Sequence, residues 1–80
     1  MSDRVAEKIL YIISKEMGVP LHELDADARF TEELGADSLD VTTILAAIQD
    51  ELHVQFDVNN IEQIKTINEL IEHVRGLQAK

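Results

Sequence analysis

The sequence predicts an all-α fold, a small four-helix bundle with three main helices, one short helix and a long first loop. Apolar residues recur at helical spacing in separate stretches, and residues that start or stop helices flank these stretches. No stretch alternates convincingly enough to form a strand. With 80 residues the chain is long enough for one compact domain and too short for two, so residues 1–80 are assigned to a single domain.

The first helix is predicted over residues 3–16, where apolar side chains recur about every four positions. Ser2 is the expected N-cap, and Gly18, followed closely by Pro20, ends the helix. Residues 18–36 are then expected to form a long loop, because they are polar and lack helical periodicity. The apolar side chains expected to pin this loop to the core are Leu21, Leu24, Phe30 and Leu34.

Two more long helices follow the loop. The second helix is predicted from Ser38 to Leu52, and the last opens at a capping box formed by Thr66 and Glu69. Residues 57–63 are expected to form a short helix between them. The side chains expected to face the core are Val41, Ile44, Leu45, Ile48 and Leu52 in the second helix, and Ile67, Leu70, Ile71, Val74 and Leu77 in the last.

Composition excludes several classes of function. The chain has no cysteine, so any thiol chemistry must come from an attached group. Its net charge is −9, and residues 30–64 hold eight acids but no lysine or arginine. Such a field repels nucleic acid and attracts basic protein surfaces, although acidity that merely aids solubility is the alternative. A polar N-terminus and short apolar runs predict a cytoplasmic protein without membrane insertion, and like-charge repulsion predicts a monomer.

Ser38 is the residue best suited to carry chemistry. Gly35 permits a turn, Asp37 can cap, and Ser38 occupies the first turn of the second helix with an exposed hydroxyl. A phosphate ester on this hydroxyl would lie near free backbone N–H groups at the positive end of the helix dipole. The site therefore suits a phosphodiester, and from these residues alone a simple capping role stays open.

The segment GADSLD at residues 35–40 resembles the attachment motif of the acyl carrier protein family. Members share an Asp-Ser-Leu core, matched here by Asp37, Ser38 and Leu39, at the start of the second helix. Their length, acidity and four-helix arrangement match over essentially the whole chain. The resemblance implies that a phosphopantetheinyl transferase (holo-acyl-carrier-protein synthase) moves 4′-phosphopantetheine from coenzyme A to Ser38, which makes the chain a phosphoprotein.

The resemblance also implies how such a protein works. The thiol of the arm holds acyl intermediates as thioesters for enzymes of fatty-acid biosynthesis or related lipid and polyketide metabolism, so the chain is a carrier and not an enzyme. The acidic second helix docks against basic patches on acyl synthases and acyltransferases, through Asp37, Asp40, Asp50 and Glu51. The bundle interior shelters the acyl chain, and the candidate lining residues, which plain core filling would also explain, are Phe30, Val41, Ile44, Leu45, Ile48, Ile64 and Ile71.

Two segments depart from the family pattern. Fatty-acid members usually continue the motif with Val-Glu, whereas this chain has Thr42-Thr43, so a glutamate is missing from the docking face. Many members also have a proline and a glutamate-rich third helix after the second helix, whereas residues 57–63 of this chain read DVNNIEQ. These changes are expected to shift partner preference, which leaves a specialised carrier and the housekeeping role equally open. A D-alanyl or peptidyl carrier is a further alternative, but the GADSLD context favours acyl cargo.

Other readings of the sequence are weaker. An EF-hand beginning at Asp25 fails, because its fifth and sixth positions are Arg29 and Phe30. No metal site is expected, since the histidines lack a third ligand at suitable spacing, and all three (His22, His53 and His73) are expected at the surface. No Gly-x-Ser-x-Gly elbow surrounds Ser38, which argues against a hydrolase. The main alternative is a stand-alone acidic helical interaction module without a prosthetic group, in which Ser38 is only a cap.

Overall fold

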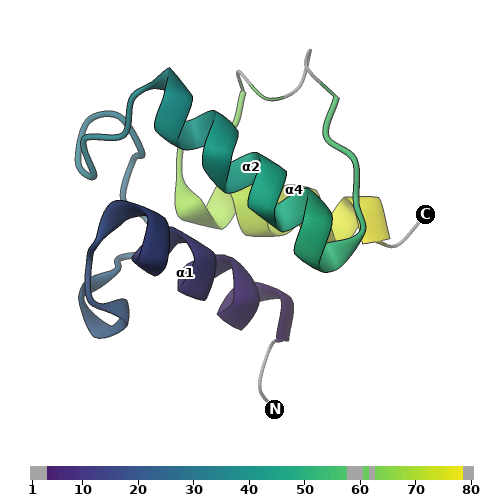
Figure 1. Ribbon diagram of the computed structural model, residues 1–80, viewed down its shortest axis with the longest axis horizontal. Helices are drawn as coiled ribbons and strands as arrows, with labels where there is room; N and C mark the ends of the chain where they lie inside the picture. Colours follow the sequence, from purple (N-terminus) through teal and green to yellow (C-terminus); the bar gives the residue numbers. More distant parts are fainter. Residues whose placement is uncertain (1–3, 58–60, 62, 79–80) are drawn as a thin grey trace.

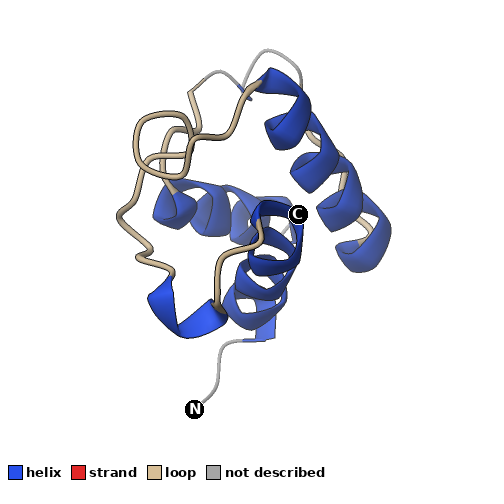
Figure 2. Ribbon diagram, turned by 60° about the vertical axis from the view of Figure 1, so that its left-hand side comes forward, coloured by secondary structure: helices blue, strands red, loops and turns tan. Residues whose placement is uncertain are grey.

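The computed structural model describes residues 4–57, 61 and 63–78. Its helices are α1 (Arg4–Met17), the short 3₁₀ helix η1 (Leu21–Glu23), α2 (Ser38–Leu52) and α4 (Ile67–Gln78). This part of the chain holds no strand (Figure 2), and its one extended pairing is an isolated bridge between Arg29 and Thr66. The predicted all-α fold and its three main helices are therefore confirmed. The short helix predicted over residues 57–63 lies largely outside the described residues, as does the predicted N-cap Ser2.

The boundaries of α1 and α2 follow from local sequence. Gly18 ends α1 with a φ of 67°, a left-handed conformation that glycine adopts without steric cost. The Ser14 hydroxyl donates to the Val19 carbonyl at 2.6 Å and fixes the chain as it leaves the helix. α2 begins and ends at the predicted residues, and His53 closes it in the left-handed region with a φ of 56°.

The core lies where the three long helices meet. α1 packs against both α2 and α4, and α2 crosses in front of α4 in the view of Figure 1. The periodicity of the sequence correctly predicted the inward faces, because the fully buried side chains all come from the expected stripes. These side chains are Ile9, Ile13, Ile44, Ile48, Ile67, Leu70 and Val74.

The long loop contains one element that the sequence did not predict and one side chain that it placed wrongly. Phe30 is buried, and Leu24 and Leu34 pack half-buried against the core, as expected. Leu21 was expected to pin the loop but is 51% exposed. It begins η1, and a single 3₁₀ turn after Pro20 is too short to bury a face, so Leu24 packs in its place.

A set of backbone hydrogen bonds ties the loop to the start of α4, and we call it the loop–α4 contact. The Phe30 N–H donates to the Lys65 carbonyl at 3.1 Å, and the Asn68 N–H donates to the Ala26 carbonyl at 2.8 Å. The Ile67 N–H donates to the Ala28 carbonyl at 3.4 Å. The loop is thereby held as a defined structure, and the backbone of Phe30 is fixed by bonds at both its N–H and its carbonyl.

One of the two hydrogen bonds of the predicted capping box is present at the start of α4. The Glu69 N–H donates to the Thr66 hydroxyl oxygen at 3.1 Å, and that hydroxyl in turn donates to the Glu69 carboxylate at 3.2 Å. The carboxylate therefore supports the capping side chain itself. Such a cap contributes about 1 kcal/mol to helix stability.

One histidine prediction was wrong. His22 and His53 are exposed, but His73 is half-buried and stacks on Phe56, with ring centroids 5.7 Å apart and an angle of 14° between the rings. Its position on α4 brings it against the segment that follows α2, a contact that the spacing of the histidines does not reveal. None of the helices in the described part of the chain has the length and apolar content needed to span a bilayer.

Candidate functional site

Ser38 lies between the two residues of a capping box, Asp37 and Asp40, at the start of α2. The Asp37 carboxylate accepts a hydrogen bond from the Asp40 N–H at 2.9 Å, and the Asp40 carboxylate accepts one from the Asp37 N–H at 3.2 Å. The sequence predicted Asp37 as the cap but not the reciprocal bond from Asp40. Because both carboxylates are held at the helix end, the first turn of α2 is fixed around the exposed Ser38.

The segment before Ser38 is turned and anchored so that the helix starts there. Gly35 has a φ of 70°, a conformation in which an L side chain is strained. The next residue, Ala36, is buried, and its N–H donates to the Phe30 carbonyl at 2.8 Å. The loop is thus fixed to the core immediately before the exposed Asp37-Ser38-Leu39 segment.

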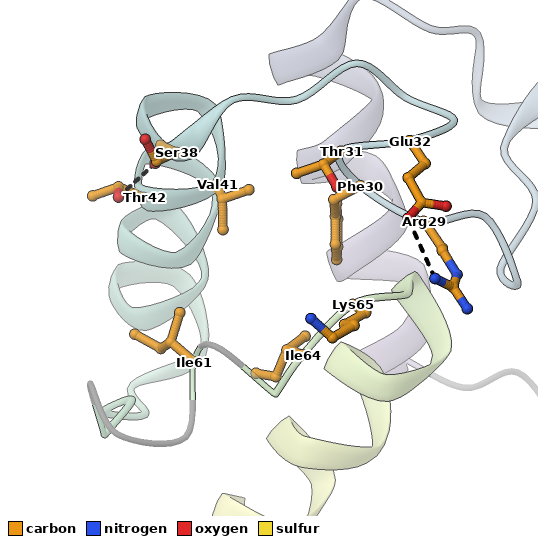
Figure 3. Close-up of a pocket in the computed structure, with 10 residues that line it drawn as sticks. All are labelled: Arg29, Phe30, Thr31, Glu32, Ser38, Val41, Thr42, Ile61, Ile64 and Lys65. Carbon is orange, nitrogen blue, oxygen red and sulfur yellow. Dashed lines mark hydrogen bonds and ion pairs between the residues drawn. The ribbon is translucent and has the colours of Figure 1, made fainter.

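A pocket of about 660 Å³ opens beside Ser38, between α2, the long loop and the segment before α4 (Figure 3). Three of the candidate lining residues, Phe30, Val41 and Ile64, line this pocket. The other four are packed into the buried core, and they are Ile44, Leu45, Ile48 and Ile71. An apolar pocket wall therefore begins within reach of the serine, while the deeper residues fill the bundle.

The pocket also has polar lining residues that sequence reasoning missed. They are Arg29, Thr31, Glu32, Thr42 and Lys65. Thr42 could have been found, because it lies four residues after Ser38 and therefore one helical turn further on the same side of α2. Lys65 could not, because only the loop–α4 contact brings it near this part of the molecule.

The four predicted docking residues do not share one face of α2. Asp37 and Asp40 form the capping box, and the Glu51 carboxylate lies 3.7 Å from the Lys8 ammonium of α1. Asp40 and Glu51 are eleven residues apart, which places them on one line along the helix, toward α1. Asp50 is exposed and projects about 100° away from that line.

The outer face of α2 has little charge. Helical spacing places Leu39, Thr43, Ala46 and Asp50 on one stripe, and all four side chains are exposed. Leu39 is the large hydrophobic residue with the greatest exposure on the described surface, at 72%. The Thr43 hydroxyl donates to the Leu39 carbonyl at 2.9 Å, so this position, where the family resemblance led us to expect glutamate, is neutral and its hydroxyl is bonded within the helix.

The described residues offer no obvious metal centre, since nowhere among them do three or more His, Asp or Glu side chains gather in a way that could hold an ion. The features that stand out are an exposed serine at a helix start and an adjoining pocket with apolar walls. They fit a phosphate-linked arm on the hydroxyl, because the helix end favours the phosphate and the pocket can receive what the arm carries.

Comparison with known proteins agrees with this description. Residues 7–74 match the model of the phosphopantetheine attachment site family. The chain is 36% identical over 74 residues to the acyl carrier protein of Nitratidesulfovibrio vulgaris strain DP4, covering 92% of this chain and 97% of the relative. It is 37% identical over 70 residues to the acyl carrier protein of Solidesulfovibrio magneticus, covering 88% and 90%.

A solved structure extends the match to three dimensions. The crystal structure of the acyl carrier protein from Thermotoga maritima superposes with a TM-score of 0.79 at 29% identity, covering 95% of this chain and 88% of that one. The fold and the matched region define a phosphopantetheine-dependent carrier domain. The chain belongs to the acyl carrier protein family. It is a carrier and not an enzyme, and the interaction module without a prosthetic group is not favoured.

Proposed function

We propose that Ser38 is the residue that carries the 4′-phosphopantetheine of this acyl carrier protein. The single observation that carries this assignment is its position, exposed in the first turn of α2 between the two capping aspartates and lining the pocket. When attached, the arm supplies the thiol that this cysteine-free chain lacks and holds acyl groups as thioesters.

The residues around Ser38 prepare the site. The capping box holds the first turn of α2 in place, so the backbone of Ser38 is fixed while its exposed hydroxyl faces an approaching transferase. Asp37 and Leu39 flank the hydroxyl and are exposed, which makes them the residues that an approaching transferase meets first. Phe30, Val41 and Ile64 offer an apolar wall to the acyl group.

Partners of the family are phosphopantetheinyl transferases and the synthases and acyltransferases that use the acyl groups. For this chain, docking involves basic patches that meet Asp37, Asp40, Asp50 and Glu51. Since Asp50 alone of these projects from the outer face of α2, the exposed Leu39 carries a larger share of partner contact there than acidic residues do. This distribution supports a specialised carrier with dedicated partners over the housekeeping role.

The molecule acts as one carrier domain and a monomer in the cytoplasm. The net charge of −9 makes copies of the chain repel one another, and a chain without cysteine is suited to a reducing compartment. As a tether, it raises the local concentration of its cargo at each partner's active site.

The test is intact mass after incubation with coenzyme A and a broad-specificity phosphopantetheinyl transferase. The wild type should gain one arm, and Ser38→Ala should gain none. Thr42→Val is the matched control, because it removes the neighbouring hydroxyl on the same side of α2 and should still be modified. An arm on Ser38→Ala, or no arm on a folded wild type with several transferases, would sink the assignment.

A further inference from the structure

The described residues that line the pocket beside Ser38 carry a charge opposite to that of the protein. The chain carries a net charge of −9, with eight acids and no lysine or arginine between residues 30 and 64. The described residues that line the pocket nevertheless include two cations, Arg29 and Lys65, and a single acid, Glu32. These described residues sum to +1 in a strongly acidic molecule, which favours an anionic occupant.

The two cations of the pocket are not equivalent. The Arg29 guanidinium contacts the Glu32 carboxylate at 3.4 Å, and in Figure 3 it points away from the space between α2 and the loop. The Lys65 ammonium points into that space, beside Ile64 and below Phe30. Among the described residues no carboxylate forms an ion pair with Lys65. Arg29 is thus neutralised by its neighbour, whereas Lys65 is available to a ligand.

The backbone of Lys65 is fixed relative to the pocket. Its carbonyl accepts a hydrogen bond from the Phe30 N–H at 3.1 Å, and the neighbouring Thr66 forms the isolated bridge with Arg29. A lysine on a fixed backbone loses less freedom on binding than one on a mobile segment. Lys65 is exposed, so an ion pair formed by its ammonium is accessible to solvent and of modest strength.

We propose that Lys65 is the anion-binding residue of the cargo pocket and that it favours acyl groups bearing a carboxylate. The inference rests on the proposed attachment at Ser38, because the arm must deliver the acyl group to the pocket that both residues line. Phe30, Val41 and Ile64 contact the methylene part of the acyl group, and the Lys65 ammonium donates hydrogen bonds to the carboxylate. Lys65 thereby offsets the repulsion that an acidic carrier exerts on an anionic cargo.

A phosphodiester and a carboxylate present the same anionic oxygen chemistry, so the test must separate the arm from the cargo. Three samples carry on Ser38 the bare arm, a hexanoyl arm or an adipoyl arm, the last two as hydrolytically stable amide analogues. Hexanoyl and adipoyl both have six carbons and differ in whether the chain ends in a methyl group or a carboxylate. Intact mass first establishes one arm per chain, and if none attaches to Ser38, the proposed function and this inference both fail.

The readout is the NMR chemical shift of the Lys65 amide and side-chain signals. The adipoyl arm should shift them well beyond the hexanoyl and bare arms, and the additional shift should shrink as sodium chloride is raised to about 0.5 M. Lys65→Met should abolish the adipoyl-specific shift at Ile64 and Thr66, whereas Arg29→Gln, the control for the other cation, should retain it. Lys65→Arg should also retain the adipoyl-specific shift, because arginine keeps the positive charge.

Two results would overturn the proposal. If adipoyl and hexanoyl arms shift Lys65 equally, the pocket does not distinguish a carboxylate from a methyl group. If the bare arm alone produces the full shift, the phosphodiester is the partner of Lys65 and cargo selectivity is excluded. Since a solvent-accessible ion pair changes an equilibrium about two- to fivefold, the selectivity expected between the two acyl groups is of that order.

Discussion

Asp37 and Asp40 each accept a hydrogen bond from the backbone N–H of the other, at 2.9 and 3.2 Å, and the exposed Ser38 lies between them in the first turn of α2. The two acids therefore stabilise the helix start that presents the serine. They are also among the residues through which the family resemblance predicts partner docking. Substitutions at these positions must be interpreted with both roles in mind.

Removing the cap should lower stability in a way that charge alone does not explain. We expect Asp37→Ala to reduce the free energy of unfolding by about 1 kcal/mol, because the Asp40 N–H loses its acceptor. Asp37→Asn should retain most of the stability, since an asparagine oxygen also caps. Urea unfolding followed by circular dichroism measures both. Asp50→Asn, at an exposed position, should stay within about 0.5 kcal/mol. Equal losses for Asp37→Ala and Asp37→Asn would contradict the capping role.

Leu39 and Leu45 are both on α2 but differ in burial, so the effect of a leucine-to-alanine substitution on stability can be compared between them. Leu39 is 72% exposed and Leu45 is 6% exposed. We expect Leu45→Ala to cost about 2–5 kcal/mol, because it leaves a cavity in the core, and Leu39→Ala to change the free energy of unfolding by less than about 0.5 kcal/mol. In contrast, Leu39→Ala should raise the KM of a phosphopantetheinyl transferase for the carrier. A destabilised Leu39→Ala would show that this leucine packs within the fold, contrary to its exposure.

Gly35 and Gly76 should respond to alanine with opposite signs. Neither position has a heavy atom within 4 Å of an added Cβ, so backbone conformation alone decides the outcome. Gly35→Ala should cost about 1–2 kcal/mol, because its φ of 70° is strained for an L residue. Gly76→Ala should gain about 0.5–1 kcal/mol, because Gly76 lies within α4. Thermal unfolding distinguishes the two, and a stabilising Gly35→Ala would mean that the turn before Ser38 is not required.

Restoring the missing glutamate should strengthen binding to basic partners. Thr43 is exposed on the outer face of α2, where its hydroxyl bonds only within the helix. We expect Thr43→Glu to lower the KM of a basic transferase for the carrier by up to about fivefold at low salt, which corresponds to about 1 kcal/mol. Thr43→Gln controls for size and should have no such effect. An improvement that persists unchanged in high salt would point to packing and not to charge.

The parts of the structure that sequence predicted correctly are those set by local interactions. The bounds of α2 follow from an N-cap aspartate and a stripe of apolar residues, and the end of α1 follows from Gly18. Ser38 was located in the same way, because a helix start and its neighbouring residues are visible in a short segment. Leu21 was misplaced because a three-residue 3₁₀ turn has no periodicity to read.

The features that sequence did not predict depend on contacts between distant segments. Lys65 lies at the pocket because its carbonyl accepts a hydrogen bond from the Phe30 N–H. A backbone bond of this kind between distant segments cannot be predicted from a pattern of side chains. His73 is half-buried, and Phe56, from the segment that follows α2, stacks on it. Both relationships require the fold to be known, which is why the apolar wall was partly anticipated and its cation was not.

The loop–α4 contact also supplies an internal reporter of how the pocket opens. The amide hydrogens of Phe30 and Asn68 are bonded to carbonyls of a distant segment and not within a helix. If the loop lifts away while the bundle stays folded, these hydrogens will exchange with deuterium faster than those in the middle of α2, and if the two regions open together, the rates will agree. Comparing these exchange rates thus measures, without any label, how often the proposed cargo pocket becomes accessible.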